Sequence, residues 1–329
     1  MVPFGAGRRI VYDLDPSGLP VLPRADYERV RMPQMLYDLP DGMHFDVPPD
    51  VYYEPDVRLF SQSAAEELIK SPAHFRAWLR GSRARDSKAM EFGRAAHMAF
   101  LEPERFRRTY VVEPDWGPCR ANAELGVSKE EGKANKDRRD AWRAQFPKET
   151  TQYVTAEDFA SMVGVARSID RHALASRMLD GGQSEVTLLW TCRETGVRCK
   201  ARIDHWHESV EMACDFKNLR DSSARAFVRV SREHGYRRQA VHYLRGLATL
   251  GLSSGECDKF QFVCAEPLDP YAVDVHFLSD EALAHGDVDI LQAKRALAES
   301  LATDTWPARP DDRPNCVGLE RWETIQHGG

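Results

Sequence analysis

The stretch that decides the fold runs from Cys199 to Lys217 and reads CKARIDHWHESVEMACDFK. In its first half, charged residues alternate with small or apolar ones, and this period of two is typical of a half-buried β-strand. The second half is a mostly apolar run that begins near Val210, and the residues around Glu208 predict a turn between the two runs. We therefore predict a β-hairpin over this stretch.

Three polar side chains of the predicted hairpin can share one face. Asp215 and Lys217 are two positions apart, so on a strand both side chains point to the same side. Asp204, on the neighbouring strand, can face the same space. Apolar neighbours such as Phe216 surround Asp215, and a carboxylate in such surroundings needs a partner or a metal. The pattern favours a metal site, and the alternative is an edge hairpin whose charges face water.

Length and composition bound the class of protein. The chain has 329 residues, 42% of them hydrophobic, and can bury a sizeable core. It has no long apolar run and no charged-then-apolar beginning, so we expect a soluble, cytoplasmic protein with no membrane-spanning segment. Its seven cysteines are an odd number without a C-x2-C pair, which predicts reduced thiols rather than a disulfide framework, a zinc site or an iron-sulfur cluster.

Charge is unevenly distributed along the chain. The formal net charge of −6 does not by itself indicate nucleic-acid binding. Arginines and lysines nevertheless gather in two segments, residues 76–108 and 220–245. Such local positive segments suit an enzyme that grips phosphates in one groove, and ordinary solvated helix faces are the alternative.

Two parts of the chain differ in pattern. Residues 1–58 are rich in Pro, Asp and Tyr with little periodicity, which predicts an irregular N-terminal arm; whether it is a lid or an oligomer contact stays open. Residues 59–329 are predicted to form one domain. Its first half should contain a polar loop or weakly held helix over 113–148 and helices over 63–70, 71–81, 86–101 and 155–179. Ser63, with Glu66 three residues on, is expected to cap the first of these helices.

The second half supplies most of the predicted sheet. Residues 185–192 form a strand that turns into the hairpin, so three successive strands make a meander. One or two helices over 222–251 follow, then strands over 259–265 and 272–278 and a final helix over 280–301. This order predicts an α/β fold with a central mixed sheet flanked by helices.

The helix predicted over residues 86–101 carries a histidine on its inward side. His97 lies on the apolar stripe formed by recurrences of three and four residues. Such a histidine is either a satisfied core residue or a metal ligand. Gly93 and Ala96 let the helix press closely against another element, which favours the ligand.

Four separated segments together resemble one family of nucleases, the exodeoxyribonuclease VIII (RecE-type) branch of the PD-(D/E)XK superfamily. The lambda exonuclease and RecB-type nuclease domains are more distant relatives. The resemblance covers about residues 61–250 and implies a restriction-endonuclease-like core. The segments, in order, are LIKSPAHFRAWLRG with FGRAAHMAFLEPERF, SEVTLLW with TGVRCKARIDHW, ACDFKNLRD, and GYRRQAVHYLRGL.

The resemblance implies a metal centre. Asp204 and Asp215 correspond to the carboxylates that bind metal in the family, and His97 to a helix histidine that helps to hold it. The backbone carbonyl of Phe216 would be an extra ligand, and Glu185 would have a supporting metal or DNA role. The oxygen-rich donor set suits Mg2+ or Mn2+.

The resemblance also implies roles beside the metal. Lys217 corresponds to the catalytic lysine, whose pKa we expect to be lowered near a cation; a plain salt bridge to Asp215 is the alternative. Gln239 and Tyr243 match a Q-x-x-x-Y element that holds the DNA strand. Arg202 is a candidate phosphate clamp, or an ordinary strand ion pair. Asn218 departs from the family, where Thr is usual.

The function implied is that of a metal-dependent DNA exonuclease that resects linear duplex ends for phage-type recombination. A single-strand annealing protein would be a partner, and a ring-shaped homo-oligomer is plausible for the family. One alternative is a RecB-like or Cas4-like nuclease of different polarity acting on single-stranded DNA, although the absence of cluster cysteines disfavours the Cas4-like form. Another is an inactive nucleic-acid-binding adaptor on the same fold.

Overall fold

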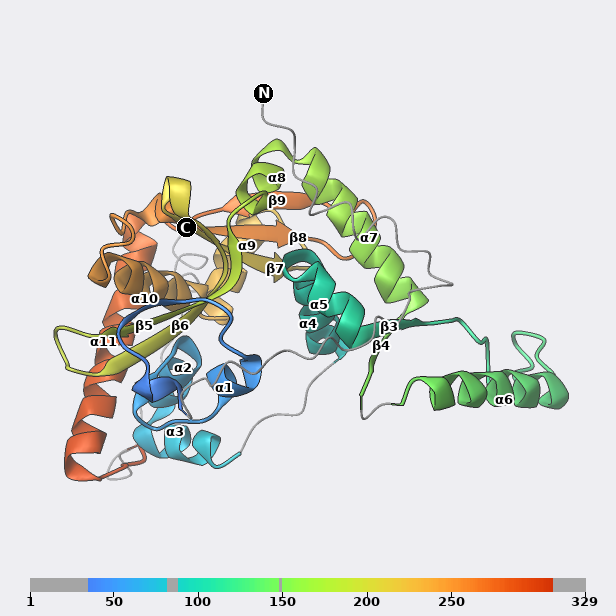
Figure 1. Cartoon of the computed structure of the whole chain (residues 1–329), viewed down its shortest axis with the longest axis horizontal. Helices are drawn as coiled ribbons and strands as arrows, with labels where there is room; N and C mark the ends of the chain where they lie inside the picture. The colour runs from blue at the N-terminus through green and yellow to red at the C-terminus, as the bar shows by residue number, and fades with distance from the viewer. Residues whose placement is uncertain (1–34, 82–87, 148–149, 310–329) are drawn as a thin grey trace, which may run out of the picture.

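The computed structural model describes residues 35–81, 88–147 and 150–309. Its centre is a seven-stranded mixed sheet in the order β1–β5–β6–β7–β8–β9, with β2 paired to β6 (Figure 1). This architecture confirms the predicted α/β fold with helices around a mixed sheet. The strands are β1 (Gly42–His44), β2 (Leu59–Phe60), β5 (Gln183–Thr191), β6 (Arg198–His207), β7 (Met212–Asn218), β8 (Phe260–Ala265) and β9 (Val273–His276).

The predicted meander forms the middle of this sheet. Strands β5, β6 and β7 pair antiparallel, and β8 then pairs parallel to β7. A short 3-10 helix, Glu208–Val210, makes the turn between β6 and β7. Both faces of β5 and β6 are largely buried, so these strands lie in the interior of the domain.

Helices cover both faces of the sheet. On one side, α2 (Gln62–Lys70), α10 (Tyr236–Thr249) and α11 (Asp280–Thr303) pack with the strands in the largest hydrophobic cluster. On the other side, α7 (Ala156–Arg171) and α8 (Ala173–Leu179) pack against apolar residues of β7 and β8. The side chains of a strand alternate between faces, so β7 and β8 contribute to both clusters.

Most predicted elements are present with shifted ends. Helix α2 begins after Ser61, whose hydroxyl accepts from the amide of Ala64, so the predicted cap at Ser63 is wrong. The helix predicted over 155–179 is two helices, because His172 leaves the helical conformation and caps α8. The remaining helices are α3 (Pro72–Leu79), α4 (Lys88–Leu101), α5 (Pro103–Thr109) and α9 (Ala224–Glu233).

The polar segment after residue 113, predicted as a loop or a weakly held helix, contains a helix. It contains α6 (Lys129–Gln145), which lies away from the sheet (Figure 1). A separate two-stranded parallel sheet, β3 (Tyr110–Glu113) with β4 (Gln152–Thr155), connects this part to the body. Trp142 of α6 packs near Trp116 and Tyr153, and these aromatic contacts fix the helix locally.

The described part of the predicted N-terminal arm, residues 35–58, contains short regular elements. Strand β1 pairs antiparallel with β5 at the edge of the sheet, and α1 (Pro49–Tyr53) follows it. Val47 and Tyr52 are buried in a hydrophobic cluster that includes Leu189 of β5. Residues 35–58 therefore pack on the body and extend its sheet, whereas residues 1–34 lie outside the described part of the chain.

Two further findings concern the helices and the cysteines. No helix in the described ranges is both long and apolar enough to cross a membrane. Cys119, Cys192, Cys199, Cys214, Cys257 and Cys264 are free thiols in the structure, and Cys316 lies outside the described residues.

Candidate metal centre and active site

Three carboxylates lie in a row across the meander. The register pairs His205 with Cys214, which makes Asp204 and Asp215 the next opposed positions of β6 and β7. On the other side of β6, Ser184 pairs with His205 and Val186 with Ile203, so Glu185 lies opposite Asp204. Opposed residues of antiparallel strands project to the same face. The strand pairing thus gathers Glu185, Asp204 and Asp215.

A histidine from α4 completes the group. The Nε2 atom of His97 is 2.9 Å from Oδ2 of Asp204, and its Nδ1 atom is 3.4 Å from Oε1 of Glu185. Ala95, Ala96 and Ala99 of the same helix are almost fully buried, and their small side chains allow the close approach. Gly93 does not serve this purpose, because a Cβ there would meet nothing within 4 Å.

His97, Glu185 and Asp204 fit a divalent metal ion. Each offers one ligand atom, and these atoms lie within 4.8 Å of one another. One imidazole nitrogen with two carboxylate oxygens is a donor set that Mn2+ and Mg2+ accept. The geometry therefore gives Glu185 a more central position than its predicted supporting role.

Asp215 has a different set of contacts from the predicted metal ligand. It is 1% exposed, its Oδ2 lies 2.6 Å from Nζ of Lys217, and its Oδ1 accepts a 2.6 Å hydrogen bond from Nε2 of Gln239. It does not belong to the group of three candidate ligands. Metal binding by Asp215 remains a prediction.

The two carboxylates beside Lys217 favour the protonated form of its amine. Burial by itself lowers the pKa of Lys217, but the carboxylates of Asp215 and Asp204 outweigh it and raise the pKa above its usual value. The expected lowering of this pKa refers to the site with a cation bound and remains a prediction. The amine also lies 4.6 Å from the ring centre of Tyr236.

The three candidate ligands, His97, Glu185 and Asp204, shift one another's pKa values. Burial disfavours the imidazolium of His97, but Asp204 and Glu185 raise the pKa of His97 to about 9. Burial raises the pKa of Glu185 to about 7 against the opposing charge of His97. Burial also acts upward on Asp204, and the His97 charge and hydrogen bond outweigh it and lower the pKa of Asp204. A bound cation would replace the protonated imidazole as the neutralising charge.

The main chain of β7 orients Asp204. The backbone N–H of Phe216 donates a 2.8 Å hydrogen bond to Oδ2 of Asp204. This contact involves the amide of Phe216, whereas the predicted ligand was its carbonyl oxygen, which remains a prediction. Because Phe216 itself is buried against Phe100 of α4, the strand and the histidine helix are packed together at this point.

Arg202 is placed differently from an open phosphate clamp. It is 6% exposed, its Nε lies 3.4 Å from Oε2 of Glu185, and its guanidinium donates to the carbonyl of Val47. The ring of Tyr52 lies 4.6 Å from its Cζ. Arg202 therefore orients Glu185 beneath the segment that carries β1 and α1, as in the ion-pair alternative.

Gln239 and Tyr243 both lie on α10, as the Q-x-x-x-Y spacing predicts. The Gln239 amide is used by Asp215, and Tyr243 is 8% exposed with its ring against Phe260. Burial raises the pKa of Tyr243, and a hydrogen bond with Gln239 opposes that rise. Direct contact of either side chain with DNA remains a prediction.

Sequence reasoning missed two features of the site. Tyr52 and Val47 support Arg202 from a segment that looked irregular, and the only signal was the aromatic pair Tyr52–Tyr53 beside Pro48 and Pro49. Glu185 has a backbone φ of +57°, in the left-handed region, which costs on the order of 1 kcal/mol for a non-glycine residue. No sequence pattern marks this conformation.

A mixed sheet that carries a carboxylate row, a lysine two positions beyond one carboxylate and a histidine from a packed helix defines a restriction-endonuclease-like fold with a candidate metal centre. A family model described as a PDDEXK-like domain of unknown function (DUF3799) matches residues 61–316, and the chain belongs to this family. Membership confirms the PD-(D/E)XK part of the predicted resemblance and leaves the RecE-type branch as a prediction.

The fold is also found in a solved structure. A crystal structure of a protein from Eubacterium rectale, described as a candidate exonuclease, aligns with a TM-score of 0.50 and 13% sequence identity. The alignment covers 87% of this chain and 100% of that one, so the likeness extends over the whole fold. A comparison with curated proteins gave no match.

Proposed function

We propose that the protein is a Mg2+- or Mn2+-dependent deoxyribonuclease that removes nucleotides from the ends of linear duplex DNA. This proposal rests on one observation: two groups of side chains lie next to each other in the sheet. His97, Glu185 and Asp204 offer ligand atoms to one ion, and the Lys217–Asp215 pair shares the carboxylate row with them.

The chemistry needs a nucleophile and a means of neutralising charge on the phosphate. A divalent ion held by His97, Glu185 and Asp204 supplies an activated water and a Lewis acid when bound. The Lys217 amine lies 2.6 Å from Asp215 in the carboxylate row, where as an ammonium it would stabilise negative charge on the phosphate oxygens. Asp215 holds the Lys217 amine in place, and Gln239 holds Asp215.

The exonuclease mode rests on two similarities. Four segments of the sequence resemble the RecE-type branch, and the Eubacterium rectale protein with the same fold is described as a candidate exonuclease. On this basis we propose a role in phage-type recombination, with a single-strand annealing protein as partner and a ring-shaped homo-oligomer as the working form.

A degradation assay tests the proposal. Linear duplexes labelled at the 5′ or the 3′ end and a closed circular duplex are incubated with Mg2+, Mn2+ or EDTA. We expect metal-dependent loss of one end label, no cutting of the circle, and a rate for Lys217→Ala lower by about a hundredfold or more. Arg295→Ala, on the exposed side of α11, is the matched control for loss of a positive charge.

Three results would contradict the proposal in different ways. Cutting of the circle would replace the exonuclease mode with an endonuclease. Degradation of single strands alone would favour the RecB-like alternative. Binding of DNA without metal-dependent cleavage of any substrate would show that the protein is an inactive adaptor on a nuclease fold.

A further inference from the structure

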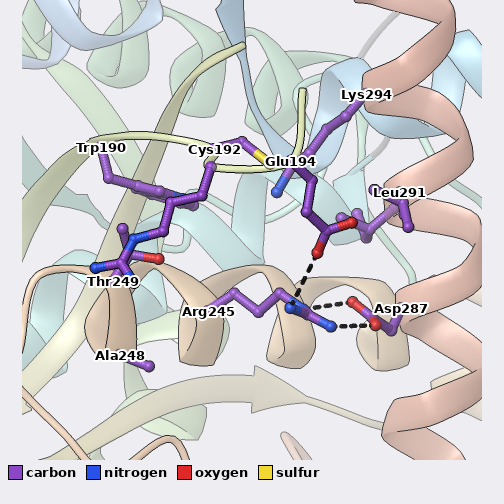
Figure 2. A pocket seen from close by; sticks show the side chains of 11 residues that line it. Trp190, Cys192, Glu194, Arg245, Ala248, Thr249, Asp287, Leu291 and Lys294 are labelled. Carbon is purple, nitrogen blue, oxygen red and sulfur yellow. Dashed lines mark hydrogen bonds and ion pairs between the residues drawn. The ribbon is translucent and has the colours of Figure 1, made fainter. Parts of the chain in front are cut away.

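A second polar site lies at the other end of α10. A cavity of about 250 Å³ opens between the end of β5, the last turns of α10 and the middle of α11 (Figure 2). Ala248 of α10 lines this cavity, nine residues beyond Gln239. At 1.5 Å per residue of helix, the cavity is about 13 Å from the candidate active site along α10.

Lys294 of α11 forms the buried charged part of the cavity wall. It is 2% exposed, and its amine lies 5.4 Å from the ring centre of Phe60 and 5.9 Å from that of Trp190. No carboxylate in the described ranges forms an ion pair with this amine. A buried ammonium without a counter-ion is costly, so the site is electrostatically incomplete without an anion.

Three other charged side chains that line the cavity form ion pairs with one another. Arg245 donates from both Nε and a terminal nitrogen to the carboxylate of Asp287, and Glu194 lies 3.7 Å from it (Figure 2). These acidic groups are therefore engaged with Arg245, and within the described residues the Lys294 amine has the buried thiol of Cys199 as a hydrogen-bond partner and no carboxylate beside it. Ile290 and Leu291 add an apolar surface beside it.

A thiol lies next to this amine. Figure 2 shows the sulfur of Cys192 and the amine of Lys294 directed toward the same part of the cavity. Burial acts to raise the pKa of Cys192, but a hydrogen bond with Thr195 and the charge of Lys294 outweigh it and lower the pKa. A molecule bound at Lys294 would therefore lie in reach of a nucleophilic sulfur.

We propose that this cavity binds a small organic monoanion, with Lys294 as the partner of its anionic group, Ile290 and Leu291 against its apolar part, and Cys192 beside it. The site is separate from the nuclease centre and does not depend on nuclease activity. One unmatched positive charge selects a single negative charge, and the limited volume selects a small molecule.

Alkylation of Cys192 reports on this site directly. The full-length protein is treated with iodoacetate, which is anionic, or with iodoacetamide, its neutral counterpart. In both reactions the thiolate forms a bond to the methylene carbon and iodide leaves. Mass spectrometry gives the rate at Cys192 and, as an internal reference, at Cys119, which is also a free and partly exposed thiol.

We expect the ratio of the iodoacetate rate to the iodoacetamide rate to be about tenfold higher at Cys192 than at Cys119, because a nearby ammonium attracts the anionic reagent. Lys294→Met removes the charge and should abolish this preference. Arg295→Met removes an exposed charge from the same helix and should leave the preference unchanged. Equal ratios at Cys192 and Cys119 in the wild type would overturn the proposal.

A second measurement covers the case in which Lys294→Met fails to fold. Butyrate is added to the wild-type protein before iodoacetamide, and butyramide serves as its neutral match. We expect butyrate to slow alkylation of Cys192 and not of Cys119, with no effect of butyramide. Equal protection by both compounds, or by neither, would show that the cavity does not select anions.

Discussion

Gln239 and Asp215 are joined by a hydrogen bond of 2.6 Å from the amide Nε2 to the carboxylate Oδ1. This bond connects α10 to the third strand of the meander and leaves the other carboxylate oxygen of Asp215 to Lys217. Gln239 therefore acts on the candidate active site through Asp215, whether or not it also touches DNA.

Gln239→Leu should lower kcat more than it weakens DNA binding. A hydrogen bond to a charged group is worth about 1.5–3 kcal/mol, so the expected loss in kcat is roughly 10- to 100-fold. Steady-state kinetics on labelled duplex would measure kcat and KM separately. A rise in KM with kcat unchanged would instead support the predicted DNA-holding role of Gln239. Gln292→Leu, on an exposed part of α11, is the control.

Removal of metal should destabilise the protein through the group of three candidate ligands. Mn2+ at 100 times its Kd adds about 2.7 kcal/mol to the free energy of unfolding, and EDTA should reverse this gain. His97→Ala and Asp204→Asn should each abolish the rise in Tm with Mn2+, as measured by thermal melting. A full metal-dependent rise in Tm in both variants would place the metal elsewhere.

Without metal, the stability of the protein should fall as the pH rises from about 4.5 to about 7, in part because of Glu185. Burial raises its pKa from the ordinary 4.5 to about 7, so the folded state holds the proton more tightly than the unfolded state. Stability from this group is complete below pH 4.5 and is lost as the pH rises through 7. Glu185→Gln should flatten this part of the pH profile, measured by urea unfolding in EDTA. An unchanged slope would show that Glu185 does not titrate in this range.

Local patterns in the sequence predict the middle of the fold well. The alternation in 199–207 and the spacing of Asp215 and Lys217 depend only on neighbouring residues, and the antiparallel register then brings Asp204 opposite Asp215. The helix periodicity likewise places His97 on the inward side of α4. Each of these inferences needs only the periodicity of one helix or strand and the position of the hairpin turn.

Contacts between distant segments explain what the sequence does not predict. Arg202 looks like a free cation until β1 and α1 bring Val47 and Tyr52 over it. The direction of the Lys217 pKa shift depends on how much charge two buried carboxylates place beside it, which spacing alone does not reveal. The same holds for α6, whose polar sequence has no apolar stripe and depends on aromatic contacts instead.

The segment over Arg202 should matter for both stability and activity. Tyr52 is 7% exposed, its ring lies near Arg202, and its carbonyl accepts a 2.6 Å hydrogen bond from Lys200. Tyr52→Leu should cost about 1–3 kcal/mol of unfolding free energy and lower the nuclease rate, because Arg202 then orients Glu185 less well. Tyr52→Phe keeps the ring and should retain most of both. If the Tyr52→Leu protein is less stable but keeps wild-type activity, the segment that carries Tyr52 does not contribute to the candidate active site.

Gly286 of α11 and Gly93 of α4 should respond in opposite ways to alanine. A Cβ at Gly286 would lie 2.5 Å from the carbonyl oxygen of Arg237, at the start of the helix that carries Gln239, whereas a Cβ at Gly93 would meet nothing within 4 Å. Gly286→Ala must push α11 from α10, at a cost of about 1–3 kcal/mol, and should also weaken the Gln239–Asp215 bond. Gly93→Ala should be neutral or stabilising by up to about 1 kcal/mol through helix propensity.

Urea unfolding and the nuclease rate of both variants test this pair. Equal stability of the two would mean that the helices are not packed this closely, and loss of activity in Gly93→Ala would show that α4 needs a glycine near the metal centre.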